Sequence, residues 1–490
     1  MSSMPELPKR PYIPTAPEEL LARAKRRSAA SRRHRLVGGG GSLTVVVALV
    51  LVGILVPASG ARPQPSSKRP GKIVVSAHIG SAYELTASET PASPASPGVA
   101  KAVEKAEVGF SLELMRDLVS TNAAAEPTNV LVSPSSLATA LAMLELGAAG
   151  STEQAIAATL QSASLSAGDQ AAGWHRLETL LGDETSTTGA NLKHEPELNI
   201  ANALFLQEHF SVLPAFVRAL SSEFQTGLWE VNFANDLAAA TNAINQWTSE
   251  NTKGLIKELF SPGSLTPTTV LVLADAVYFH AEWARKFDSA TTDRPFYLAT
   301  GSSESVPFMT SGPDESSKLL TVPVSASSHY TAVELPYAGK KLSALVVMPT
   351  GSSLSSFVSS LTPASLGQIV GGLSRQAIQL LMPTFTEHDD NQLNQTLSSM
   401  GMSQAFEQAN FTNITPEPPL AVHAVEQHAY LQVTPQGTTA AAATGVGVVA
   451  TATRAGEPRV VIIDHPFLFL VRDDATGAIL FESMVENPAL

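Results

Sequence analysis

The sequence contains no cysteine, and this absence excludes several kinds of protein at once. Disulfide frameworks, thiol nucleophiles and cysteine-ligated metal sites cannot occur. Three common motifs of enzymes are missing as well: the G-x-S-x-G elbow, the H-E-x-x-H zinc motif and the Walker loop. We therefore expect no enzyme activity, no bound metal and no cofactor.

Charged residues are also scarce, at 15% of the chain, and they are unevenly placed. Residues 1–41 hold nine Lys or Arg against three Glu, whereas residues 101–490 hold 18 basic and 39 acidic residues. The net charge of about −21 on residues 101–490 argues against nucleic acids and heparin-like polyanions as partners. Hydrophobic residues make up 44% of the 490 positions, which is ample for a large core.

A charge-free segment, residues 36–61, follows the basic leader. Its apolar centre, Leu43 to Val56, is short for a membrane span of about 20 residues, but the adjoining glycines extend it sufficiently. We predict a single-pass anchor at residues 42–60 in the plasma membrane, with basic residues 1–41 in the cytoplasm and the rest extracellular. Ala58 and Gly60 form a small-x-small pattern, so cleavage near Gly60 and secretion remain the alternative.

Beyond the anchor the composition changes twice. Residues 61–100 are rich in Pro, Ser and Ala, as expected of a linker, although residues 72–79 (KIVVSAHI) resemble a strand. Residues 101–490 read as one folded domain, with helical spacing at 102–118, 135–146 and 240–259. Strand patterns occur at residues 270–279, 330–337, 342–349, 377–383, 429–435, 459–471 and 478–485. Strands and helices mixed in runs favour an α+β fold.

Residues 434–453, TPQGTTAAAATGVGVVATAT, carry no charge and no aromatic side chain. As a strand, the tract would present only small or β-branched side chains on both faces. It could then enter a sheet between two existing strands without burying a charge. Alanine also favours helices, and such tracts are often linkers, so the tract alone leaves helix, linker and inserting strand open.

The segments around this tract carry a specific resemblance. The hinge QGTTAAAAT, followed by DHPFLFLVRD and GAILFESMVENP, resembles the reactive-loop end of the serpins, which are loop-inserting inhibitors of serine proteases. Further segments match the family in the right order: NVLVSPSSLATALAMLELGAAGSTEQAI (129–156), INQWTSENTKGLIKELF (244–260), LVLADAVYFHAEWARKFD (271–288), ELPYAGKKLSALVVMP (334–349) and LSSMGMSQAFEQANFTNIT (397–415). The resemblance covers residues 101–490 and, with the predicted anchor, suggests a membrane-anchored member of prokaryotic type.

The resemblance implies both a fold and an activity. The fold would be the α+β serpin fold, with a large mixed central β-sheet, smaller sheets, about eight to nine helices and an exposed reactive loop near the C-terminus. The activity would be suicide inhibition by a monomer: a serine protease cleaves the loop, becomes trapped as an acyl-enzyme, and the freed loop inserts into the central sheet. The alternative is a non-inhibitory serpin that is cleaved as a substrate and acts as a binding or chaperone-like protein.

The resemblance also assigns residues to the reactive loop. The hinge residues are Gly437, Thr438, Thr439, Ala440, Ala441, Ala442, Ala443 and Thr444. The family's usual spacing places the reactive bond at Thr451–Ala452, which favours an elastase-like or subtilisin-like target. The bond can also lie elsewhere between Val449 and Arg454, and cleavage at Arg454–Ala455 would indicate a trypsin-like target.

Two other family sites map onto the sequence. The shutter residues are Ser133, Pro134, Ser135, Asp275 and Gln427, and the breach tryptophan is Trp283. The family's shutter Asn–His pair is replaced here by Asp275 and Gln427, which we expect to form a polar cluster near Ser133 and Ser135. His428 is expected to be a surface residue.

One departure from the family pattern precedes the hinge. Pro435 and Gln436 stand where the family often carries acidic residues. Because proline lacks an N–H donor, Pro435 is expected to stiffen the strand just before the hinge.

Overall fold

The structure, a computed structural model, describes residues 72–121, 128–185, 196–288, 291–311, 319–417, 420–438 and 459–490. The predicted basic tail and membrane anchor lie outside these residues. Within the described part of the chain, no helix is both long and apolar enough to span a membrane.

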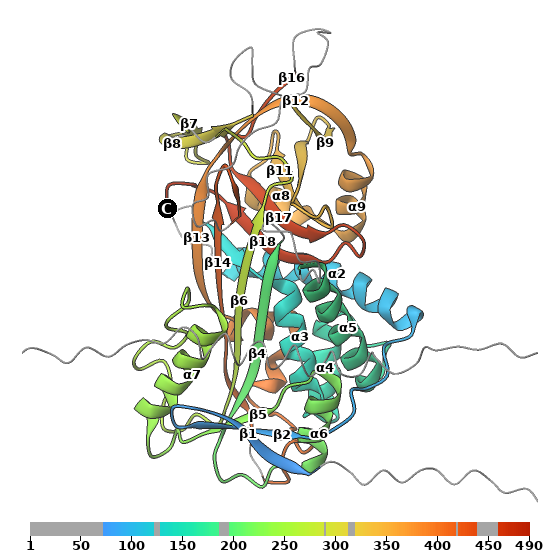
Figure 1. Ribbon diagram of the computed structural model, residues 1–490, viewed down its shortest axis with the longest axis vertical. Coiled ribbons are helices and arrows are strands. Elements are labelled where there is room, and N and C mark those ends of the chain that lie inside the picture. The colour runs from blue at the N-terminus through green and yellow to red at the C-terminus, as the bar shows by residue number, and fades with distance from the viewer. Residues whose placement is uncertain are drawn as a thin grey trace, which may run out of the picture. The chain divides into compact units, whose positions relative to one another are not determined.

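Eight strands form a mixed sheet, here called sheet A, in the order β1-β2-β5-β4-β6-β15-β14-β13 (Figure 1). The strands are β1 (Ile73–Ile79), β2 (Ala82–Ala87), β4 (Glu197–Gln207), β5 (Leu228–Val231), β6 (Leu271–Glu282), β13 (Phe385–Gln392), β14 (Val422–Val433) and β15 (Gly437–Thr438). The pairs β4–β5 and β6–β14 are parallel, and the others are antiparallel. Strand β6 is buried on both faces along most of its length, which explains why its sequence is mostly apolar.

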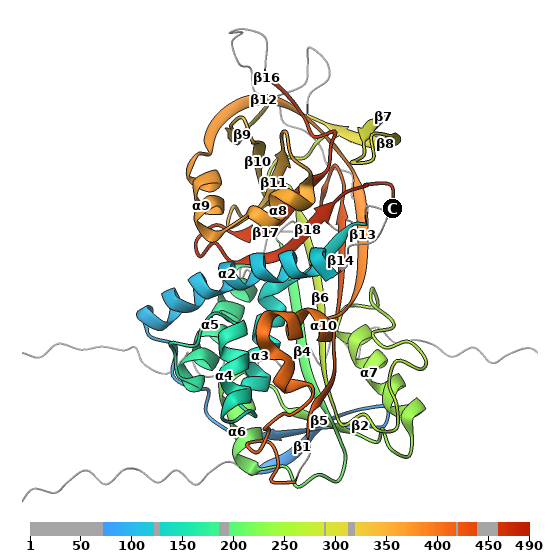
Figure 2. The ribbon, with the colours of Figure 1, turned by 180° about the vertical axis from the view of Figure 1, so that it is seen from behind.

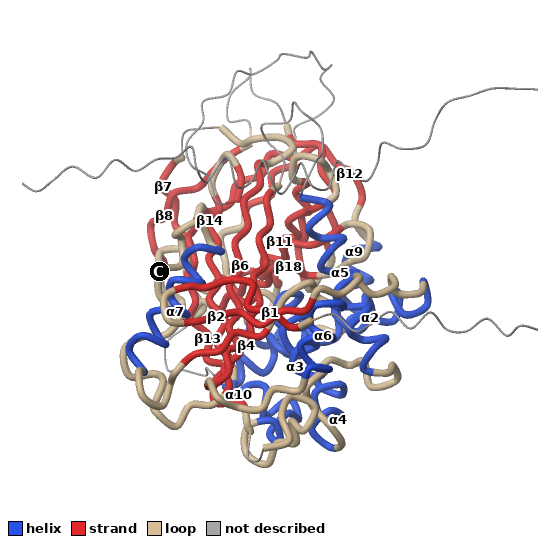
Figure 3. Tube along the Cα trace, turned by 60° about the horizontal axis from the view of Figure 1, so that its bottom comes forward, coloured by secondary structure: helices blue, strands red, loops and turns tan. Residues whose placement is uncertain are grey.

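Helices cover both faces of sheet A. Leu273 and Val277 of β6 belong to the main hydrophobic core, which includes Leu141 of helix α3 (Pro134–Glu145). The alternate residues of β6 point the other way and pack in a second core with Ile244 of helix α7 (Leu237–Asn251). Figures 2 and 3 show α7 on one side of the strands and α3 on the other. The alternation of side chains along β6 thus places the two cores on opposite faces of one sheet.

A second sheet contains ten strands in the order β3-β18-β17-β11-β10-β9-β12-β8-β7, with β16 paired to β12. These strands are β3 (Val130–Val132), β7 (Thr292–Tyr297), β8 (Ser303–Thr310), β9 (Leu320–Ala326), β10 (Tyr330–Pro336), β11 (Leu342–Pro349), β12 (Ser374–Pro383), β16 (Arg459–Ile462), β17 (Phe467–Asp473) and β18 (Ile479–Val485). The resemblance implied further sheets beside the central one, and among the described residues these ten strands connect into a single second sheet.

The described residues contain nine α-helices, within the range of about eight to nine that the resemblance implied. They are α2 (Pro97–Thr121), α3, α4 (Ser151–Thr159), α5 (Ala167–Thr185), α6 (Pro214–Glu223), α7, α8 (Leu354–Ser360), α9 (Pro363–Gly371) and α10 (Asn394–Leu397). The helix expected at 240–259 is shorter than predicted. It ends at Asn251 because Lys253 and Gly254 adopt positive φ angles of 55° and 78°, which terminate helices.

The predicted linker at residues 61–100 is also shorter than expected. Strands β1 and β2 pair with each other, and β2 pairs with β5, so residues 73–87 belong to sheet A. Helix α2 then begins at Pro97. The apolar alternation of KIVVSAHI therefore marked a real strand inside a segment whose overall composition resembles a linker.

Candidate functional site

The first two hinge residues already lie inside sheet A. Strand β15 pairs with β6 through Gly437 opposite Glu282 and Thr438 opposite Ala281, and it also pairs with β14. The side chain of Thr438 is fully buried, and its hydroxyl lies 2.6 Å from that of Tyr337. The chain therefore enters the sheet between β6 and β14 at Thr438.

Only glycine fits at position 437. A Cβ atom there would lie 2.1 Å from the carbonyl oxygen of Ala281, well inside van der Waals contact. Because that oxygen belongs to the backbone of a buried central strand, it cannot move aside cheaply. Gly437 thus allows the hinge to approach β6 closely enough to pair with it.

The turn that precedes the hinge explains the proline at position 435. The amide of Thr434 donates to the carbonyl of Gly437 at 2.8 Å, and the reverse bond measures 3.2 Å. Pro435 lies in the middle of this two-residue turn, where no N–H donor is required. Its carbonyl accepts a hydrogen bond from the amide of Phe287 at 2.9 Å. The proline therefore shapes the turn and removes no ladder bond from a strand, contrary to the expectation from the sequence.

Trp283 packs against this turn and forms hydrogen bonds with it. Its ring stacks on that of Tyr337 with centroids 4.7 Å apart, and its indole Nε1 donates to the carbonyl of Thr434 at 2.9 Å. Its backbone amide donates to the carbonyl of Gln436 at 3.0 Å. The structure thus brings the predicted breach tryptophan to the point where the hinge enters the sheet, while its role in admitting the loop stays a prediction.

Further down the sheet, Asp275 on β6 and Gln427 on β14 face each other across the parallel ladder. The Gln427 amide donates to the Asp275 carboxylate at 2.5 Å and to the carbonyl of Ser133 at 2.9 Å. The amide of Ser133 returns a bond to Gln427 at 2.8 Å. Both side chains are fully buried. We call the cluster of Ser133, Asp275 and Gln427, which joins β6 to β14, the polar lock.

The serine that completes the cluster is Ser136, not the predicted Ser135. The hydroxyl of Ser136 donates to Asp275 at 2.5 Å, whereas that of Ser135 is buried and has no hydrogen-bond partner in the described part of the chain. Pro134 occupies the first turn of α3 after its N-cap Ser133. Since successive helical residues differ by about 100° in direction, only one of the two serines that follow can face β6.

Asn202 on β4 also contacts this cluster and was not predicted from the sequence. It lies opposite Asp275 in the β4–β6 ladder, and its amide donates to the carbonyl of Ser136 at 3.1 Å. A polar residue in the otherwise apolar run IANALFL (200–206) was the available signal. The cluster therefore ties three adjacent strands to helix α3.

The environment of Asp275 favours its protonated form. Burial raises the pKa of this carboxyl to about 7, and the hydrogen bonds from Ser136 and Gln427 partly oppose the rise. A desolvated carboxylate is unfavourable unless its partners compensate for the lost water. Asp275 is therefore a titratable group in the middle of the seam between β6 and β14.

His428 is not the surface residue that the sequence analysis expected. It is buried on β14, and its Nδ1 atom approaches Oδ1 of Asp390 on β13 to 2.9 Å. The expectation failed because it considered β14 alone, without the neighbouring strand that carries Asp390.

The remaining predicted loop residues lie outside the described residues. These are the hinge positions Thr439 to Thr444 and both candidate reactive bonds, Thr451–Ala452 and Arg454–Ala455. The described chain resumes at β16, which pairs in parallel with β12.

Known proteins with similar sequences belong to the family that the sequence resembles. A family model described as serpin (serine protease inhibitor) matches residues 105–488. An uncharacterized serpin-like protein of Thermococcus kodakarensis is 30% identical over 445 residues, covering 91% of this chain and 98% of its own.

Two solved structures resemble the fold over most of this chain. Native protease nexin-1 with heparin matches with a TM-score of 0.67 and 27% identity, over 79% of this chain and 100% of its own. Human thyroxine-binding globulin complexed with its hormone matches with a TM-score of 0.69 and 26% identity, over 80% and 99%.

Proposed function

The chain belongs to the serpin family, and we propose that it is a suicide inhibitor of serine proteases. Members of this family are typically protease inhibitors and not enzymes, which supports the proposal. The observation that carries the proposal is the burial of Thr438 between β6 and β14. In the proposed mechanism, a protease cleaves the loop, remains attached as an acyl-enzyme, and is displaced as residues after Thr438 insert into sheet A.

The pairing of Thr438 fixes where later residues would lie if the strand continued. Thr438 lies opposite Ala281 on β6 and the last residue of β14. In an antiparallel ladder, each step forward along one strand is a step back along its neighbour. Six residues further on, Thr444 would lie opposite both Asp275 on β6 and Gln427 on β14.

A threonine suits that position. The residues that would share the core-facing side with Thr438 are Ala440, Ala442, Thr444, Val446 and Val448. Thr444 is the one polar member of this set, and its place coincides with the polar lock. Its hydroxyl can accept from the Gln427 amide and donate to the Asp275 carboxylate. Before insertion, Gln427 and Asp275 are joined by a hydrogen bond. After insertion, bonds from each of them to Thr444 would replace it.

The energetics also favour insertion after cleavage. Separating β6 from β14 breaks one parallel ladder, but the new central strand makes two antiparallel ones. Insertion from Thr438 to about Thr451 would span about 45 Å at roughly 3.3 Å per residue. That distance would carry an attached protease along the whole length of the sheet.

The loop sequence guides the choice of target. Cleavage at Thr451–Ala452 would suit an elastase-like or subtilisin-like protease, and cleavage at Arg454–Ala455 a trypsin-like one. The negative charge of residues 101–490 argues against activation by a heparin-like cofactor.

The location of the inhibitor forms part of the proposal. The charge-free segment and its basic flank support an anchor at residues 42–60, with the inhibitory domain on the outer face of the membrane. From there it would protect the cell surface against proteases.

Incubation with proteases tests the proposed function. The full-length protein is mixed separately with subtilisin, pancreatic elastase and trypsin, and the products are examined on a denaturing gel and by intact mass. We expect a covalent band at the summed mass, and a released C-terminal peptide whose first residue identifies the reactive bond. Clean loop cleavage by all three proteases, each remaining fully active, would contradict inhibition.

That contrary result would favour the alternative, a non-inhibitory serpin that acts as a binding protein. The structural likeness to thyroxine-binding globulin, solved with its hormone bound, makes this a real second candidate. The two functions require different hinge sequences. An inhibitor needs a charge-free tract that can enter the sheet, whereas a binding protein does not.

A further inference from the structure

We propose that His388, Asp390 and His428 form a binding site for Zn²⁺ or a similar first-row divalent cation on sheet A. This site is separate from the hinge and the polar lock, and its existence does not depend on inhibitory activity. It includes the buried histidine that the sequence analysis expected on the surface.

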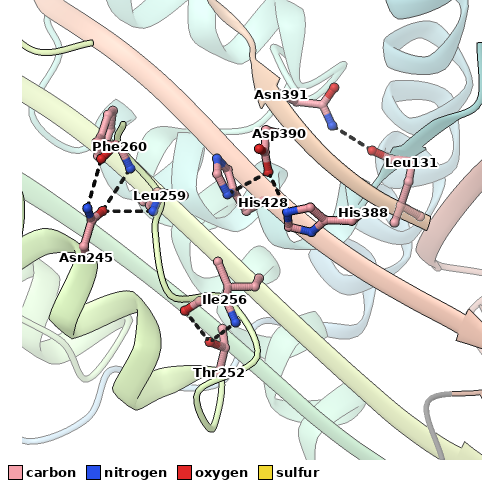
Figure 4. A network of polar contacts seen from close by, with 10 residues as sticks. All are labelled: Leu131, Asn245, Thr252, Ile256, Leu259, Phe260, His388, Asp390, Asn391 and His428. Carbon is pink, nitrogen blue, oxygen red and sulfur yellow. Dashed lines mark hydrogen bonds and ion pairs between the residues drawn. The ribbon is translucent and has the colours of Figure 1, made fainter. Parts of the chain in front are cut away.

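Strand register brings the three side chains together. His388 and Asp390 are two residues apart on β13, so they project from the same face of the strand. His428 lies directly opposite Asp390 in the β13–β14 ladder. Figure 4 shows the Asp390 carboxylate between the two imidazole rings.

The distances suit a set of metal ligands. Oδ1 of Asp390 lies 2.9 Å from Nδ1 of His428 and 3.1 Å from Nε2 of His388, and all three atoms lie within 4.8 Å of one another. Ligand atoms around a tetrahedral Zn²⁺ with bonds near 2.0 Å are separated by about 3.3 Å. A small widening of the cluster would therefore admit the ion.

His428 supplies an independent indication. Its side chain is only 6% exposed, and its Nδ1 atom has no hydrogen-bond partner among the described residues, although Oδ1 of Asp390 lies 2.9 Å away. Buried polar atoms normally form hydrogen bonds, so a buried nitrogen that faces a carboxylate without forming one requires an explanation. A cation bound between them would satisfy both groups.

The chemistry of the donors selects the cation. Two imidazole nitrogens and one carboxylate oxygen favour zinc and its first-row neighbours over Mg²⁺, which prefers oxygen ligands. The side chains of His388 and Asp390 are 50% and 57% exposed, which leaves a path for the ion and room for water ligands.

The position of the site predicts how it behaves during loop insertion. All three ligands lie on β13 and β14, on one side of the seam between β6 and β14. A bound cation would therefore join β13 to β14 without bridging the strands that separate. We expect it to bind the intact and the loop-cleaved protein with similar affinity.

Calorimetric titration of the full-length protein, freed of metal with a chelator, tests this proposal. We expect one Zn²⁺ per chain, a higher thermal midpoint with Zn²⁺ than with Mg²⁺, and visible absorption bands when Co²⁺ is used. His388→Ala should weaken Zn²⁺ binding at least tenfold, since loss of even an outer-shell partner typically weakens metal affinity 10- to 100-fold. Because His388 is half exposed, this variant should fold, and far-ultraviolet circular dichroism checks that it does.

Two comparisons make the test decisive. His329→Ala removes an exposed histidine in the turn between β9 and β10 and should leave binding unchanged. Asp390→Asn should weaken binding as His388→Ala does. Equal Zn²⁺ affinity in the wild type and both site variants, or no preference for Zn²⁺ over Mg²⁺, would overturn the proposal.

Discussion

Replacing Ala442 with arginine is expected to abolish inhibition and to turn the protein into a substrate. In the inserted register, residue 442 would lie opposite Val277 on β6 and Ala429 on β14, both fully buried. An unpaired charge there is unfavourable by several kcal/mol. About 3 kcal/mol added to the insertion barrier slows insertion about 100-fold, which gives the protease time to hydrolyse the acyl-enzyme.

Gel quantification of the covalent complex measures this effect. We expect the wild type to form complex with its target protease, and Ala442→Arg to yield only cleaved protein with full recovery of protease activity. Glu457→Arg is the matched control, because it places an arginine in the same loop beyond both candidate reactive bonds. The insertion register would be wrong if Ala442→Arg formed as much complex as the control.

Replacing Asp275 with asparagine is expected to remove part of the pH dependence of stability. Burial raises the pKa of Asp275 to about 7 in the folded protein, from 3.8 in the unfolded chain. The folded state therefore holds a proton that the unfolded state releases. The stability gained in this way is complete below pH 3.8 and is lost as the pH rises through 7. Asparagine cannot titrate, so the variant lacks this loss.

Urea unfolding at pH 5 and pH 8 measures the difference. Between these pH values, the wild type should lose on the order of 2 to 3 kcal/mol more unfolding free energy than Asp275→Asn. Burial also raises the pKa values of Glu145, Glu387 and Glu482 to about 8, so both proteins should weaken as the pH rises. Asp293→Asn, at an exposed aspartate of β7, is the control. Identical pH dependence in the wild type and Asp275→Asn would contradict the assignment.

Much of the fold could be predicted from the sequence because its strongest patterns are local. Strand β6 is recognisable from a long, mostly apolar segment. Helix α3 is recognisable from Ser133-Pro134, which precede an apolar helix. The end of α7 was missed because it depends on the backbone conformation of Lys253 and Gly254. Strands β1 and β2 were obscured because composition was averaged over a segment rich in proline and serine.

The candidate site was less predictable because its contacts join distant segments. The resemblance brought Asp275 and Gln427 together, but the choice between Ser135 and Ser136 depended on the rotation of α3 against β6. The pairing of His428 with Asp390 depends on the register of β13 and β14, which no local pattern specifies. The turn around Pro435 is local, and it was missed because the sequence analysis treated the residues before Gly437 as part of a strand.

The most direct test of the central claim is a crystal structure of the protein after cleavage in its loop. We predict that residues from Thr438 onward form a new central strand between β6 and β14, with Thr444 hydrogen-bonded between Asp275 and Gln427. The parallel β6–β14 ladder of the closed sheet would then be gone. A cleaved protein in which that ladder and the Asp275–Gln427 hydrogen bond persist would contradict the account.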